Sequence, residues 1–340
     1  MIVGVTGGSG FIGSWICETL TSRGHTPYVL DHKGRMEHGL LGSVRDATAV
    51  MEFAAHVDAI IHLAAVLGTT ETIDAPHAAA ETNIMGTLNV FESASRYNLP
   101  VVFAAVGNAN IARGTYCITK SCGERFVEMY RQDRGLRVIS LRPMNAYGPR
   151  QSAPAPYGSS KVRKIVPAFV CSALSGDPMR LYGGGSQYSD SVYVADVANV
   201  FVTAIEFAAA GIIPDHAIDI GNTIALTVSD VAKQVQVCIP GAVIESIPMR
   251  AGEPHGGAMA TPGALKQVVN AVVNVNRDLR RIDVQRVVRE LGTVVSADVS
   301  TLLALQLDAG DFISLQEGIA RTVDWFRDNE GLTWNRTESR

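Results

Sequence analysis

A glycine-rich turn near the start of the chain restricts the possible folds more than any other feature. Residues 2–5 are apolar, and TGGSGFIG (6–13) joins them to a helical pattern. In the spacing Gly7-x-x-Gly10-x-x-Gly13, the first glycine permits a tight turn, the second lets the backbone approach a pyrophosphate, and the third lets the helix pack on the strand. The helix N-terminus then presents free N–H groups and a positive dipole end to the anion. The turn predicts a dinucleotide-binding strand–turn–helix unit.

A carboxylate occupies the position that selects the dinucleotide. Asp31 ends the second apolar run, eighteen residues after Gly13. A carboxylate there binds the adenosine ribose hydroxyls and repels a 2′-phosphate, so NAD is expected rather than NADP. Lys33 and Arg35 lie close by and leave NADP as an alternative. An ordinary glycine turn followed by a surface aspartate is the less favoured interpretation, because both features occur in register.

The first half of the chain alternates strand-like and helix-like segments. Short continuous apolar runs between helices indicate parallel βαβ units, because strands covered on both faces need not alternate in polarity. We expect strands at 2–6, 26–30, 59–63, 101–105 and 136–141, and helices at 11–23, 44–54, 76–96 and 114–132. The predicted fold class is α/β, a Rossmann-type doubly wound parallel sheet with a smaller C-terminal α/β domain. We expect residues 1–150 to form the NAD-binding domain, with later strands returning near 190–222, and 151–340 mainly a substrate domain.

Composition excludes several classes of function. With 340 residues, a net charge of −4 and 18% charged residues, the chain offers no basic surface for nucleic acid. Its five cysteines and eight histidines lack the spacings of a disulfide framework or a metal site, and no G-x-S-x-G elbow of a serine hydrolase occurs. The sequence opens directly on an apolar strand, and its longest apolar stretch, near 199–214, contains Glu206 and is too short to cross a bilayer. We therefore expect a soluble, cytoplasmic protein with no membrane role.

Tyr116 and Lys120 are the candidate catalytic pair. Their i, i+4 spacing places both on one face of the predicted helix. A tyrosine with a pKa of about 10 is a poor base at neutral pH. A neighbouring ammonium and the positive nicotinamide ring would lower the pKa of Tyr116, and Lys120 could also hold the nicotinamide ribose.

Taken together, these residues resemble the extended short-chain dehydrogenase/reductases, in particular the NAD-dependent epimerase/dehydratase group that acts on nucleotide sugars, whose best-known member is UDP-glucose 4-epimerase. The resemblance covers nearly the whole chain. Besides the glycine turn, it rests on VDAIIHLAA (57–65), TNIMGTLNVFESA (82–94), YCITK (116–120), LRPMNAYGPRQ (141–151), VPAFV (166–170), LYGGGSQYSDSVYVADVA (181–198) and RAGE (250–253). These motifs are more specific for fold than for reaction, because one fold hosts many chemistries.

The resemblance also implies a role for each matching residue. The residues implied to line NAD are Gly7, Gly10, Phe11, Ile12, Gly13, Asp31, Leu63, Ala64 and Ala65, together with Tyr116 and Lys120. Tyr116 is implied to be the catalytic base. Asn145, Val166 and Arg250 are implied to contact the nucleotide sugar, although a solvated surface arginine is the alternative for Arg250. The implied reaction is epimerisation at C4 of a UDP-sugar through a transient 4-keto intermediate.

The sequence departs from the family pattern at two places. The turn after the fourth strand usually carries a Ser or Thr that relays a proton, but here it reads FAAVGN (103–108), and the stretch that leads to Tyr116 is short. Asn108 is the candidate substitute, although an amide cannot relay a proton as a hydroxyl does. Thr115 and the pair Thr69–Thr70 are the other candidates. The second departure is Ser189, where the family often has an arginine for the nucleotide phosphate.

Other functions and assemblies stay open at this point. The chain could be another nucleotide-sugar reductase or dehydratase, or a non-catalytic NAD-binding regulator that keeps the fold. The resemblance also implies a homodimer, in which the helices 76–96 and 116–132 pair with those of a second copy in a four-helix bundle. Both segments have apolar faces, and burial of those faces within one chain is the alternative.

Overall fold

The computed structural model describes residues 1–34, 38–68, 70–107, 114–221, 226–249, 258–259 and 311–329. These residues form two compact units. Met1–Pro143 and Ala195–Ile220 make up the first unit. The second comprises Met144–Val194 and the described residues that follow position 220. Each unit is described separately below.

A seven-stranded parallel sheet forms the centre of the first unit. Its strand order is β11-β6-β5-β4-β1-β2-β3, and every neighbouring pair is parallel. The strands are β1 (Ile2–Thr6), β2 (Thr26–Asp31), β3 (Gly39–Leu41), β4 (Ala59–His62), β5 (Val101–Ala104), β6 (Val138–Pro143) and β11 (Ile218–Ile220). The strand order reverses between β1 and β4, and in open α/β sheets ligands bind outside the carboxyl ends of the strands at such a point. The predicted Rossmann-type fold is confirmed.

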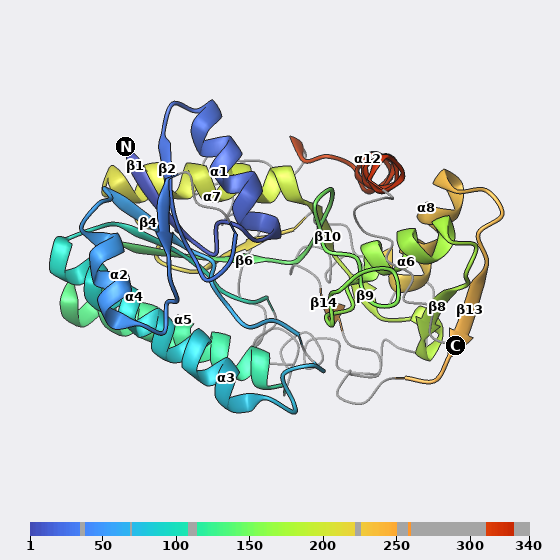
Figure 1. The fold of residues 1–340 in the computed structure, drawn as a ribbon, viewed down its shortest axis with the longest axis horizontal. Coiled ribbons are helices and arrows are strands. Elements are labelled where there is room, and N and C mark those ends of the chain that lie inside the picture. The colour runs from blue at the N-terminus through green and yellow to red at the C-terminus, as the bar shows by residue number, and fades with distance from the viewer. Residues whose placement is uncertain are drawn as a thin grey trace, which may run out of the picture. The chain divides into compact units, whose positions relative to one another are not determined.

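Helices cover both faces of this sheet. Figure 1 shows α1 and α7 on one face and α2, α4 and α5 on the other. Their bounds are α1 (Phe11–Ser22), α2 (Ala47–Ala54), α4 (Gly86–Tyr97), α5 (Thr115–Arg134) and α7 (Val194–Ala209). The helix predicted over 76–96 has three parts: α3 (Pro76–Ala80), a π-helical turn (Glu81–Met85) and α4. The sequence pattern did not indicate the π-helical turn, because a single turn of five residues is too short to show a period of its own.

Local chemistry fixes several ends of these helices. Asp46 caps α2 by accepting the N–H groups of Thr48 and Ala49 at 2.9 and 3.3 Å. Asn98 ends α4 and Gly135 ends α5, each in the left-handed conformation. Between the helices and the sheet lies a core rich in aromatic rings, in which Phe91 meets both Phe103 and Tyr130 edge-on.

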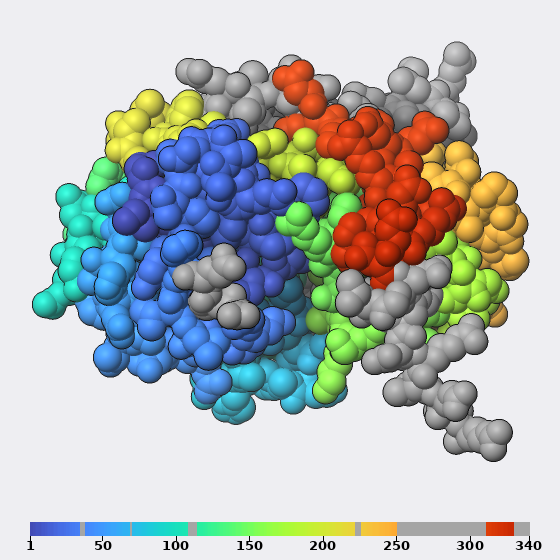
Figure 2. Space-filling model, turned by 45° about the horizontal axis from the view of Figure 1, so that its top comes forward, coloured from blue at the N-terminus to red at the C-terminus, as the bar shows by residue number. Residues whose placement is uncertain are grey.

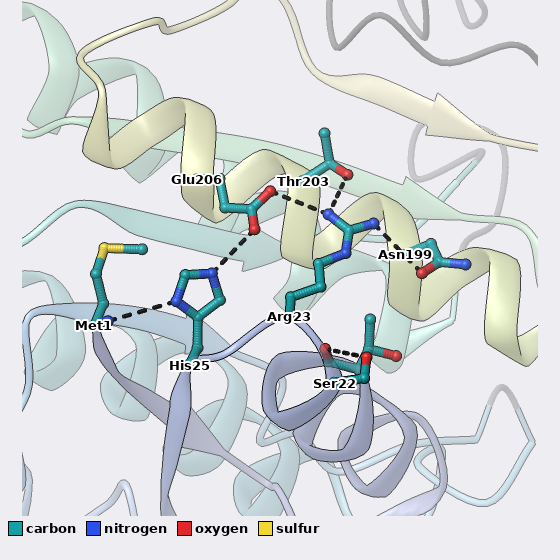
Figure 3. A network of polar contacts seen from close by, with 8 residues as sticks. Met1, Ser22, Arg23, His25, Asn199, Thr203 and Glu206 are labelled. Atoms are coloured by element: carbon teal, nitrogen blue, oxygen red, sulfur yellow. Dashed lines mark hydrogen bonds and ion pairs between the residues drawn. The ribbon is translucent and has the colours of Figure 1, made fainter.

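Polar contacts attach α7 to the N-terminal part of the chain (Figure 3). Arg23, which follows α1, donates to Thr203 and Glu206 at 3.0 Å each and to Asn199 at 3.5 Å. His25 approaches the second Glu206 oxygen at 3.0 Å. Because the Glu206 side chain is one-third exposed, each ion pair contributes little by itself. The contacts nevertheless join the segment between α1 and β2 to α7, which contains most of the longest apolar stretch of the sequence. No helix in the described ranges could span a membrane.

The described residues of the second unit form small sheets and three α-helices. β7 (Asn145–Tyr147) pairs in parallel with β10 (Ser191–Tyr193), and β8 (Met179–Tyr182) with β13 (Ile244–Ile247). β9 (Tyr188–Ser189) lies between β12 (Leu226–Thr227) and β14 (Ala258–Met259). The helices are α6 (Ile165–Leu174), α8 (Val228–Cys238) and α12 (Leu315–Asp328). Figure 2 shows the outer face of α12, in red, at the surface of the unit.

Candidate functional site

The glycine turn between β1 and α1 has the geometry of a dinucleotide site. Gly7 has a φ of +74°, and a Cβ at Gly13 would lie 2.3 Å from the Gly7 carbonyl oxygen. Gly10, the N-cap of α1, has no side chain to occupy the helix N-terminus. The turn therefore leaves backbone N–H groups available to a pyrophosphate, and the residues present fit NAD.

The residues after β4 lie against this turn, as the sequence predicted. The N–H groups of Leu63 and Ala64 each donate to the Thr6 hydroxyl at 3.2 Å. A Cβ added to Gly7 would lie 3.0 Å from the Ala64 nitrogen. The structure thus brings together the glycine turn and the segment that begins at Leu63, at the carboxyl ends of β1 and β4.

Asp31 is anchored directly to the turn. One oxygen of its carboxylate accepts the Ser9 N–H at 3.1 Å, and the other accepts the Lys33 N–H at 3.3 Å and lies 3.2 Å from His32 Nδ1. The residue is only 5% exposed. The carboxylate is therefore held where the ribose of a dinucleotide on this turn would lie. Arg35, the other residue relevant to NADP, is outside the described residues.

We expect Asp31→Asn to change the cofactor preference. The amide keeps an acceptor for the Ser9 N–H but loses the charge that repels a 2′-phosphate, so the ratio of NADP to NAD affinity should rise about tenfold or more, or roughly 1.4 kcal/mol. Titration calorimetry with both dinucleotides measures this ratio. Asp58→Asn is the control, because Asp58 also accepts a backbone N–H, that of Ile2 at 2.7 Å, but at the opposite end of β1. An equal ratio in both variants would contradict the role of Asp31.

Tyr116 and Lys120 lie in the first turns of α5. Lys120 is 2% exposed, and its Nζ lies 4.4 Å from the centre of the Phe103 ring. Burial lowers the pKa of Lys120 to about 7, although Glu124 opposes this shift. Burial, with a smaller contribution from Cys117, raises the pKa of Tyr116 above its ordinary value. This direction is opposite to the shift that the sequence argument expects from Lys120 and the nicotinamide ring, because that argument did not include the burial of the phenol.

A buried amide, which the sequence analysis did not identify as functional, fixes the backbone at Tyr116. Asn83, in the π-helical turn, accepts the Val66 N–H at 2.8 Å and donates to the Val66 carbonyl at 3.0 Å. Its second amide hydrogen goes to the Thr119 hydroxyl at 3.0 Å, which in turn donates to the Tyr116 carbonyl at 2.9 Å. Every polar atom of the Asn83 side chain is thus used to join three segments of the site. The motif TNIMGTLNV contained the residue, but its partners are set only by the tertiary structure.

The turn after β5 offers no hydroxyl in its described part. Phe103 and Val106 are both buried. Asn108, the predicted substitute for the missing hydroxyl, and Thr69 are outside the described residues. Thr115 is the half-buried first residue of α5, and the hydroxyl oxygen of Thr70 is buried without a hydrogen-bond partner.

The predicted sugar-nucleotide residues belong to the second unit. Asn145 Nδ2 donates to the Ser189 hydroxyl at 2.9 Å, and that hydroxyl lies 3.2 Å from the hydroxyl of Ser191. Val166 lies on α6 and is 3% exposed. Arg250 is outside the described residues. The structure therefore shows the Asn145 amide already bonded to the serine that stands where the family often has an arginine.

No cluster of three metal-binding side chains occurs within the part of the chain that the structure describes. The site instead combines a dinucleotide turn, a carboxylate beside it, and a tyrosine with a buried lysine. This set of groups suits proton transfer next to a bound dinucleotide.

Comparison with known proteins gives consistent results. The sequence model of the NAD dependent epimerase/dehydratase family matches residues 3–221. The chain is 27% identical to a UDP-N-acetyl-alpha-D-glucosaminuronate decarboxylase of Bacillus cytotoxicus, over 96% of this chain and 98% of the relative. It is 31% identical to a UDP-glucose 4-epimerase of Mycolicibacterium smegmatis, over 59% of this chain and 72% of the relative. Among solved structures, the UDP-glucose 4-epimerase of Thermus thermophilus in complex with NAD superposes with a TM-score of 0.71 at 26% identity, covering 96% of this chain and 99% of that one.

Proposed function

The chain belongs to the NAD-dependent epimerase/dehydratase family, and on that premise we propose that it is a nucleotide-sugar 4-epimerase that acts on a UDP-sugar. The expected family and the expected cofactor, NAD, are both confirmed. Two relatives that are UDP-glucose 4-epimerases support the choice of reaction. UDP-sugar specificity and C4 as the reacting carbon are parts of the proposal.

The observation that carries the proposal is the placement of Tyr116 and Lys120 on one face of α5, with the Tyr116 carbonyl fixed through Thr119 and Asn83. Tyr116 takes the proton from the 4-hydroxyl of the sugar as the C4–H bond breaks. When bound, NAD supplies the reversible acceptor for the C4 hydride. The 4-keto sugar then presents its other face, and Tyr116 returns the proton as the C4–H bond reforms with inverted configuration.

Lys120 supplies the charge that this reaction needs. Burial disfavours the phenolate form of Tyr116. A cation on the same helix face favours the phenolate. Lys120 has a pKa of about 7, so that it is half protonated near neutral pH and charged below it. The proposal therefore requires both residues.

Decarboxylation of a UDP-uronic acid is the second candidate function. It is favoured by the Bacillus cytotoxicus relative, 98% of whose length aligns with this chain. Oxidation at C4 of such a sugar yields a β-keto acid, which loses carbon dioxide without a further oxidant. Tyr116 would have the same role in the first and last steps. A reductase, a dehydratase and a non-catalytic NAD-binding regulator are the remaining alternatives.

Proton NMR of the protein with NAD distinguishes these functions. UDP-glucose, UDP-N-acetylglucosamine, UDP-glucuronic acid and UDP-N-acetylglucosaminuronic acid are supplied separately. A new anomeric signal of the C4 epimer without net NADH supports the epimerase and identifies its substrate. A pentose signal with release of carbon dioxide supports the decarboxylase instead. No change with any of the four sugars, although NAD is bound, would contradict both.

A homodimer is part of the proposal. Large apolar side chains are exposed along the helices predicted to pair, among them Met85 and Ile118 at 54% each. Covering such a face with a second copy would remove this apolar surface from water. Light scattering during size-exclusion chromatography measures the mass and tests this assembly.

We also propose a cytoplasmic location for the protein, because the five cysteines are unpaired.

A further inference from the structure

His62 lies between the glycine turn and helix α5, and it is completely buried. It is the last residue of β4, in register with Thr6 on β1 and Phe103 on β5. The centroids of the His62 and Phe103 rings are 5.8 Å apart, and the Lys120 ammonium lies over the Phe103 ring. Its two nitrogens approach the Thr6 hydroxyl at 2.7 Å and the Thr87 hydroxyl at 3.0 Å.

The partners of these threonines determine where every proton lies. Thr87 donates its only hydroxyl proton to the Asn83 carbonyl at 2.7 Å, so it must accept from His62 Nε2. A neutral ring that is protonated at Nε2 has an acceptor at Nδ1, so Thr6 donates to it. The Thr6 oxygen also accepts the N–H groups of Leu63 and Ala64. The hydrogen bonds thus run in one direction, from the backbone after β4 through Thr6, His62 and Thr87 to the Asn83 carbonyl.

A proton on Nδ1 would break this arrangement. The Thr6 oxygen would then face three donors, and its own proton would have no acceptor in the chain of bonds. Burial and the charge of Lys120 also lower the pKa of His62, to about 3. Lys120 is therefore the cation of this buried cluster, and His62 stays neutral beside it.

We propose that His62 is a positioning residue for Tyr116. As a neutral imidazole, it is the central member of a one-way series of hydrogen bonds. The series begins at the Leu63 and Ala64 N–H groups, beside the glycine turn, and ends in the π-helical turn that contains Asn83. The chain ends on the Asn83 carbonyl, and the Asn83 side chain continues through Thr119 to the Tyr116 carbonyl. A fully satisfied buried network of this kind holds its members in one geometry. The proposal rests on the proposed catalytic role of Tyr116.

Ring-nitrogen NMR tests the chain of bonds without any substrate. Protein carrying ¹⁵N-labelled histidine rings is compared with the variant His62→Asn, which identifies the His62 signals. We expect Nε2 protonated and Nδ1 unprotonated from about pH 5.5 to about pH 8.5, unlike an ordinary histidine, which gains its second proton near pH 6.5. A proton on Nδ1, or titration within this range, would overturn the proposal.

Variants of Thr87 test the positioning role. Thr87→Val keeps the shape of the side chain but removes the acceptor for His62 and the donor to Asn83. We expect its kcat to fall between about tenfold and a hundredfold, with KM and bound NAD within about twofold, because a small misplacement of a catalytic group costs rate rather than binding. Thr87→Ser should restore most of kcat. Amide hydrogen exchange at Thr119 and Lys120 should rise about tenfold in Thr87→Val.

Thr322→Val is the matched control. Thr322 is also completely buried in a helix and also donates to the carbonyl four residues earlier, that of Gly318 at 2.6 Å, but it belongs to the second unit. If both valine variants show the same kcat and the same exchange at Thr119, the proposal is wrong. If the wild-type protein turns over none of the UDP-sugars, the proposed function fails, while ring-nitrogen NMR and hydrogen exchange still decide whether the chain of bonds exists and restrains α5.

Discussion

Tyr116→Phe is expected to lower kcat by roughly 10²–10⁴-fold, the contribution that a general acid–base group typically makes. Phenylalanine fills the same space but has no hydroxyl to take the proton from the sugar. The Thr119 hydrogen bond that fixes the Tyr116 carbonyl does not involve the phenol. The close approaches within the glycine turn do not involve it either, so NAD should stay bound. Turnover is measured by NMR with the substrate found for the wild type, and bound NAD by absorbance after denaturation.

Tyr130→Phe controls for the loss of a hydroxyl from the same helix. Tyr130 also lies on α5, but its hydroxyl donates to Glu92, a surface carboxylate that also binds Arg134. This variant should lose a little stability and keep its kcat. Turnover by Tyr116→Phe at the level of Tyr130→Phe would remove Tyr116 from the catalytic role.

Local features of this protein were predictable from the sequence. The glycine turn and Asp31 depend on short-range rules, because glycine spacing and the end of a strand are visible along the chain. The Tyr116–Lys120 face depends only on the period of a helix. The alternation of apolar runs and helices was also sufficient to predict the parallel sheet.

Features that depend on tertiary packing were not predictable. The partners of Asn83 lie 17 and 36 residues away in sequence, and no spacing rule connects them. His62 is bonded to two threonine hydroxyls, which lie 56 and 25 residues away in sequence. The pKa values of Tyr116 and Lys120 depend on burial, which a sequence indicates only on average. The sequence therefore predicted the groups that we propose to react, but not the contacts that position them.

The cost of burying Lys120 leads to the second large expected effect: Lys120→Met should abolish turnover and stabilise the NAD-free protein at neutral pH. The pKa of Lys120 is about 7 in the folded protein and about 10.4 when unfolded. Between these values the unfolded chain binds a proton that the folded chain does not, so the free energy of unfolding rises with pH. Below pH 7 the wild type carries the full cost, roughly 3–5 kcal/mol, which methionine avoids.

Urea unfolding of both proteins at pH 6.5 and pH 8.5 measures this effect. The stability advantage of Lys120→Met should shrink by about 1–2 kcal/mol between the two pH values, because only the wild type gains stability as Lys120 loses its proton. Loss of water contact raises the pKa values of Cys17 and Cys171, which therefore titrate in the opposite sense, but these thiols are common to both proteins and their effects cancel. Lys233→Met, which removes an exposed lysine paired with Asp230, should show no such pH dependence. Parallel pH profiles for wild type and Lys120→Met would mean that burial does not lower the pKa of Lys120. The phenolate of Tyr116 would then have a fully charged neighbour at every pH at which the enzyme works.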